Sequence, residues 1–169
     1  MGDKPGTTDH HASAAFHHGQ AARYHREASK HYQVGKDYAH AAHQALEAHG
    51  HAMQAIEHAN EARQYYPGPR GGTSSEDSEP GSRFPATAEI LSKLSGAADH
   101  HVAAANDHEQ AAQHHGQAAK HRTQNDLGLA AHSAQIAYGH AQHAVFHGDE
   151  AAKHHVEHDG RARPIAELS

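Results

Sequence analysis

Histidine is the residue type in this chain that could take part in chemistry, with 24 copies among 169 residues. Two series of histidines recur at seven-residue intervals, which places each series on one stripe of a helix. The series are His11, His18 and His25, and His101, His108 and His115. Neutral imidazole is a ligand for zinc, copper(II), nickel and cobalt. The pattern therefore predicts binding of a divalent transition metal.

Other chemistries lack the residues that they need. Cysteine is absent, so thiolate metal sites, disulfides, c-type haem attachment and a cysteine nucleophile are excluded. A di-iron centre requires Glu-x-x-His on two helices, and the only acidic match at that spacing in the expected helices is Asp37-Tyr38-Ala39-His40. Zincin, nucleophile-elbow, phosphate-loop and dinucleotide motifs do not occur. We therefore expect that the protein is not an enzyme.

The histidines belong to an internal repeat. Asp9-His10-His11 recurs as Asp99-His100-His101, and Gly50-His51-Ala52 recurs as Gly139-His140-Ala141. The offset falls from 90 to 89 around Val34–Asp37. Because loops accept length changes more readily than helices do, a turn is expected there. Each repeat is predicted to be a helical hairpin.

The tandem His-His-x-x-Ala-Ala motif and the segment Glu47-Ala48-His49-Gly50-His51-Ala52 resemble short Ala/His-rich helical-hairpin proteins of bacteria, a group without an assigned activity. The resemblance covers both repeats, here as a tandem duplication. It implies a helical hairpin and transfers no site.

These features predict an all-α four-helix bundle made of two hairpins, with helices at about 9–33, 37–63, 98–124 and 127–158. The expected divisions are hairpins at 1–64 and 97–160, a Pro/Gly/Ser-rich linker at 65–96 with a short amphipathic helix around Ile90–Leu94, and a tail at 161–169. A homodimer of hairpin pairs is the alternative assembly. The long linker allows the first and third helices to run parallel or antiparallel. Antiparallel packing would place His11 against His115 and His18 against His108.

A helical projection places the two heptad series at the centre of an alanine-rich face. On the return helix of the first repeat, the inward arc contains Leu46, His49 and Met53, whereas His43 points outward. The candidate metal ligands on or near these faces are His10, His11, His17, His18, His25, His49, His101, His108, His114, His115, His140, His143 and His147.

Buried imidazoles need partners for their ring nitrogens, and the neighbouring alanines have no side-chain polar atoms to offer. Leucine would fill the same positions with a smaller desolvation cost. Storage or sequestration of copper(II), zinc or nickel by core histidines explains this choice. The alternatives are a structural or pH-responsive helical interaction protein without metal, and a bis-histidine b-type haem protein.

Charge and hydropathy restrict the partners. The net charge of −6 with neutral histidine disfavours a nucleic-acid backbone as partner. The sequence has no apolar run of about 18 residues, so we expect no membrane span and a cytoplasmic protein. Leu, Ile, Val and Phe number only 17 in all, which predicts a thin core.

Overall fold

Alanine, the strongest helix former, dominates both repeats. The computed structural model describes residues 6–35, 37–66 and 96–162. Its helices are α1 (Thr7–Val34), α2 (Tyr38–Arg63), α4 (Ala97–Thr123) and α5 (Leu127–Ala162). The predicted all-α bundle of two hairpins is confirmed, with α5 continuing beyond its expected end at 158. The helix expected around Ile90–Leu94 lies outside the described residues.

The two hairpin turns use different residues to reverse the chain. Gly35 adopts a left-handed conformation with φ 68°, and its N–H donates to the carbonyls of His31 and Tyr32. In the second hairpin the left-handed position is taken by Asn125 with φ 60°. The side chains of Asp37 and Asp126 then cap the following helices by accepting backbone N–H groups at 2.9 and 3.1 Å. The predicted turn between the first two helices is thereby confirmed.

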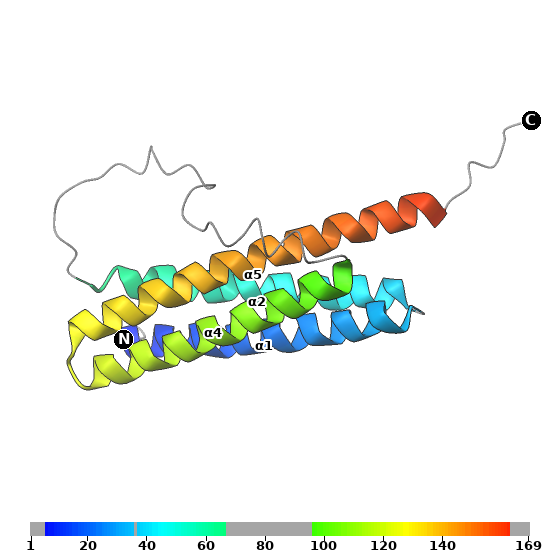
Figure 1. Cartoon of the computed structure of the whole chain (residues 1–169). Coiled ribbons are helices and arrows are strands. Elements are labelled where there is room, and N and C mark those ends of the chain that lie inside the picture. The colour runs from blue at the N-terminus through cyan, green and yellow to red at the C-terminus, as the bar shows by residue number, and fades with distance from the viewer. Residues whose placement is uncertain (1–5, 36, 67–95, 163–169) are drawn as a thin grey trace, which may run out of the picture.

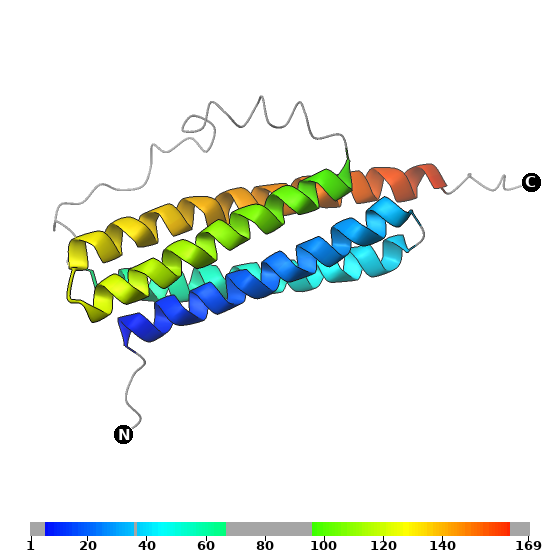
Figure 2. The same ribbon diagram turned by 60° about the horizontal axis from the view of Figure 1, so that its bottom comes forward.

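Helices α1 and α4 form the centre of the bundle and run antiparallel (Figures 1 and 2). Helix α2 packs on α1 and α5 packs on α4, whereas α2 and α5 contact each other much less closely. The bundle is therefore less tightly closed between α2 and α5. The C-terminal part of α5 extends past the neighbouring helix ends (Figure 1).

The core inverts the usual distribution of residue types. Every buried apolar residue in the described part of the chain is alanine. The largest fully buried side chains are His11, His18, His101, His108 and His115. Large apolar side chains lie outside instead, as Leu46 and Val156 do with 68% of their surface exposed. The predicted thin, histidine-centred core is confirmed.

Within the described ranges, none of the helices combines the length and the apolar character that a bilayer crossing requires.

Candidate metal centre

Six histidines from α1 and α4 form a column along the middle of the bundle. Antiparallel packing brings them together as three pairs joined through Nδ1 atoms. The Nδ1–Nδ1 distances are 3.3 Å for His11 and His115, 3.1 Å for His18 and His108, and 3.0 Å for His25 and His101. We refer to these six residues as the histidine column.

The rings of the column also stack between pairs. His18 lies 5.5 Å from His115 between ring centres, and His25 lies 5.5 Å from His108, both nearly parallel. Tyrosines close the two ends of the stack. Tyr66 lies beside His11 with its hydroxyl 2.5 Å from Nε2, and Tyr32 stacks on His101 at 5.3 Å. Eight aromatic rings therefore form one continuous series.

Each Nδ1–Nδ1 contact requires the two neutral rings to be opposite tautomers. One Nδ1 carries the hydrogen and donates it to the lone pair of the other. Consequently one ring of every pair has an Nε2–H group and its partner has an Nε2 lone pair. The Nε2 atoms of four column residues are buried without a hydrogen-bond partner: His18, His101, His108 and His115. The column thus satisfies about half of its polar atoms internally.

Burial keeps the column neutral. The pKa is lowered from 6.5 to about 4 for His11, His18 and His101, to about 3 for His25 and His115, and well below 6.5 for His108. Desolvation of the charged ring is the largest cause in every case. Nearby imidazoles add repulsion, and Arg122 does so at His11. Neutral rings retain the lone pairs that metal ions require.

The column nevertheless offers only two ligands at each pair. Two ligand atoms on one zinc ion lie about 3.3 Å apart at bond lengths of about 2.0–2.1 Å and a tetrahedral angle, so the Nδ1 separations suit an ion. A structural zinc site has four ligands. Among the described residues, however, only His10, His58 and Glu61 bring three ligand atoms close to one another.

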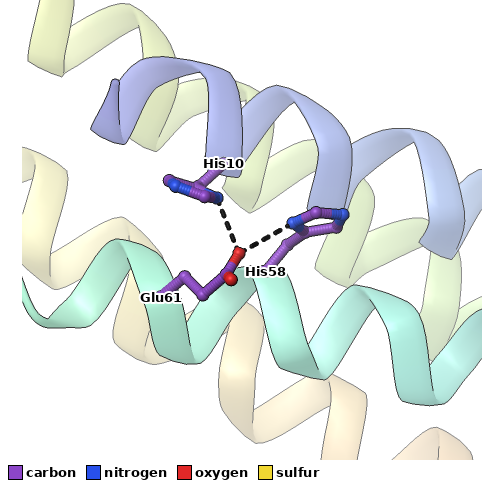
Figure 3. Close-up of side chains that lie close together, drawn as sticks. All are labelled: His10, His58 and Glu61. Carbon is purple, nitrogen blue, oxygen red and sulfur yellow. Dashed lines mark hydrogen bonds and ion pairs between the residues drawn. The ribbon is translucent and has the colours of Figure 1, made fainter. Parts of the chain in front are cut away.

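This three-residue group, which we call the seam cluster, joins α1 to α2 near the open end of the first hairpin (Figure 3). The Oε2 atom of Glu61 lies 2.8 Å from Nδ1 of His10 and 3.1 Å from Nδ1 of His58. His10 is buried, whereas the Glu61 side chain is 42% exposed. Three ligand atoms therefore meet at a point that solvent can reach.

The second repeat carries a related group between α4 and α5. His100 and His147 correspond to His10 and His58, and their Nδ1 atoms lie 3.3 Å apart. Glu150, the counterpart of Glu61, forms an ion pair with Lys153, with 2.5 Å between its Oε1 atom and the Lys153 Nζ atom. The ring of His154 lies beside that of His100, tilted against it, with ring centres 5.3 Å apart. Burial lowers the pKa of both His100 and His147.

A further pair of contacts lies along the same two helix seams. Nδ1 of His17 lies 3.1 Å from Nδ1 of His51. In the second repeat Asp107 replaces His17, and its Oδ1 lies 2.8 Å from Nδ1 of His140. His114 stacks on His140 at 5.8 Å. These groups supply two polar side chains each.

The predicted ligands therefore divide into three groups. The heptad series form the column, and His10, His17, His114, His140 and His147 lie along the helix seams. His143 is half-buried on α5. His49 is exposed, contrary to the prediction, as are Leu46 and Met53. The reason is the loose contact between α2 and α5, which leaves this part of the inward arc uncovered.

Sequence reasoning missed the carboxylates. His58 and Glu61 are three residues apart on α2, and His147 and Glu150 repeat the spacing on α5. The available signal was therefore His-x-x-Glu in both repeats, the reverse of the Glu-x-x-His order that di-iron proteins use. Helical i,i+3 spacing places both side chains on one face.

No family model matches this chain, and neither curated proteins nor solved structures give a match.

Proposed function

We propose that the protein binds and sequesters divalent transition-metal ions, with the seam cluster as the principal site. The observation that carries the proposal is the approach of two imidazole Nδ1 atoms to one Glu61 oxygen at 2.8 and 3.1 Å. In the metal-free state each of the two rings donates an N–H hydrogen bond to the Glu61 carboxylate. Binding an ion would move the hydrogen of each neutral ring from Nδ1 to Nε2, so that each Nδ1 offers its lone pair. At zinc bond lengths of about 2.0–2.2 Å, the two Nδ1–Oε2 separations would widen by roughly 0.2–0.5 Å.

The ligand set favours zinc, copper(II) or nickel. Two imidazoles and one carboxylate are borderline to hard ligands that suit these ions. One carboxylate balances part of the ion's charge, and the exposed side of Glu61 leaves a coordination position for water. Lys153 engages Glu150 in the second repeat, so we expect the group around His100 to bind metal more weakly than the seam cluster.

The column does not require metal to explain its Nδ1 atoms, because its rings bond to one another. Metal binding there stays a prediction from sequence. Haem is not proposed, because direct Nδ1–Nδ1 contacts leave no space for a porphyrin between the paired rings.

The test is a zinc titration of untagged protein, purified without a nickel column, against a competing fluorescent chelator. We expect His58→Gln and Glu61→Gln each to weaken binding by about 10-fold or more, since even changes to outer-shell partners of a metal site cost about 10–100-fold. His43→Gln is the matched control, because His43 is an exposed histidine on the same helix. Equal zinc affinity of the parent and the two seam variants would refute the site.

The column itself favours a second function, a pH-responsive helical protein. Six neutral imidazoles are buried where protonation would place charges 3.0–3.3 Å apart in an alanine core. A metal-independent loss of the fold in mild acid would support this alternative, and its measurement is described in the Discussion.

A further inference from the structure

A cavity of about 310 Å³ opens between α2 and α5 and reaches the histidine column. Its inner surface includes the rings of His25, His101 and His108, and its walls include Leu46, Val145 and Val156. Pockets for small molecules are mostly apolar with a few placed polar groups. This cavity combines apolar side chains with polar ones, which besides the column rings are Tyr32, His49, Asp149 and His155.

One polar atom at its inner end is left for a ligand. Nδ1 of His25 bonds to His101, and Nε2 of His25 lies beside the cavity-lining Gly148, 3.7 Å from where a Cβ atom would stand there. The Nε2 atoms of His101 and His108 are fully buried and do not reach the cavity surface. The shared hydrogen of the His25–His101 pair lies on one of the two Nδ1 atoms, so Nε2 of His25 is either an N–H donor or a lone-pair acceptor. A hydroxyl group both donates and accepts, so it can bond to either form.

The duplicated hairpin provides an internal comparison. At the equivalent place in the other half of the bundle, the repeat position of His49 is occupied by Tyr138 and that of Ala152 by Arg63. The Arg63 guanidinium lies over the Tyr138 ring at 5.3 Å and so bridges α2 and α5. The corresponding side chains at the cavity end, His49 and Ala152, are smaller.

Two further positions show the same difference. Val145 and Gly148 line the cavity, whereas their counterparts in the first repeat are Ile56 and the buried Ala59. A Cβ atom added at Gly148 would lie 3.5 Å from Cε1 of His25, an ordinary contact distance. Alanine would therefore fit at position 148, and glycine leaves additional space in front of the column.

Size and surface indicate the class of ligand. An apolar cavity of about 150 Å³ binds benzene, so this one suits a molecule of about two fused rings. Tyr32 already stacks an aromatic ring on His101 at this end of the column. The three imidazoles do not form a chelating set, because within the described residues only the seam cluster brings three ligand atoms together.

We propose that the cavity between α2 and α5 binds a planar two-ring aromatic molecule carrying a hydroxyl group or ring nitrogen that hydrogen-bonds to Nε2 of His25 at its inner end. The ring lies between the apolar side chains of Leu46, Val145 and Val156, and its polar atom meets Nε2 of His25. This site is separate from the seam cluster and does not depend on metal.

The probe is 2-naphthol, titrated into the metal-free full chain by calorimetry, with naphthalene as the analogue that lacks the hydroxyl. We expect one 2-naphthol per chain and weaker binding of naphthalene. The double variant His49→Tyr/Gly148→Ala copies the filled half and should weaken 2-naphthol binding at least tenfold. His43→Tyr/Gly128→Ala makes the same chemical changes at exposed positions and should bind as the parent does.

Spectra of protein with ¹⁵N-labelled histidine provide a second measurement that needs no variant. Added 2-naphthol should shift the Nε2 signal of His25 and leave those of the seam cluster in place. The proposal is overturned if the parent does not bind 2-naphthol, if the filled variant binds it equally well, or if the column signals do not move.

Discussion

His18 and His108 occupy the same position in the two repeats and face each other at the centre of the bundle, with their Nδ1 atoms 3.1 Å apart. The repeat also relates the two flanking pairs to each other. His11 corresponds to His101 and His25 to His115, so the pair His11–His115 is the counterpart of the pair His25–His101. The duplicated halves are thus joined through identical residues. The shared hydrogen makes the two rings chemically different, because one must donate and the other accept.

Single and double substitutions at this pair should have different effects on stability. His18→Leu leaves Nδ1 of His108 buried without its partner, which we expect to lower the free energy of unfolding by about 1–3 kcal/mol. His18→Leu/His108→Leu removes both polar groups and should restore stability to the parent level or above. Urea unfolding followed by circular dichroism measures both. A double variant that loses the sum of the two single effects would show that the pair is not coupled.

Acid should unfold the bundle cooperatively. The unfolded histidines titrate near 6.5, whereas the pKa of His11, His18 and His101 in the fold is about 4. Between these values the unfolded state binds more protons, so stability falls as pH falls, by about 1.4 kcal/mol per pH unit for each such histidine. Above 6.5 this contribution is fully present.

We therefore expect loss of helix between about pH 6 and 4, measured by far-UV circular dichroism in the presence of a chelator. His18→Leu/His108→Leu should shift the midpoint to lower pH, because two titrating rings leave the core. His43→Gln/His132→Gln removes two exposed histidines and should leave it unchanged. Full helicity at pH 4 would contradict the neutral, buried column.

Zinc should stabilise the folded protein through the seam cluster. An ion that binds only the native state at a free concentration of one hundred times Kd adds about 2.7 kcal/mol to the free energy of unfolding. Thermal melts with and without zinc measure this increment. We expect Glu61→Gln to abolish most of it, whereas Glu150→Gln in the second repeat should retain it. The same zinc response in both variants would place the ion elsewhere.

Tyr66 should stabilise the end of the column through its hydroxyl. Tyr66→Phe keeps the ring beside His11 but leaves Nε2 of that buried imidazole without the 2.5 Å contact. We expect a loss of about 1–3 kcal/mol in the free energy of unfolding. Tyr65→Phe is the control, because Tyr65 is 44% exposed. Equal stability of the two variants in urea would mean that the Tyr66 contact contributes nothing.

Local patterns in the sequence were sufficient for the helices and for the burial of the column. Alanine and histidine recur with helical periodicity, so the stripe containing His11, His18 and His25 could be placed on the inner face. The change of offset in the repeat also located the turn at Gly35. These inferences succeed because each depends on residues within a few turns of one another.

The tertiary structure alone decided which histidines meet. The linker is long enough for α4 to run in either direction along α1, and only antiparallel packing joins His25 to His101. The seam cluster likewise depends on how α1 and α2 are rotated against each other. The exposure of His49 follows from the loose contact between α2 and α5. Helical periodicity determines which face a residue occupies, whereas direction, rotation and separation of the helices arise from packing across the whole bundle.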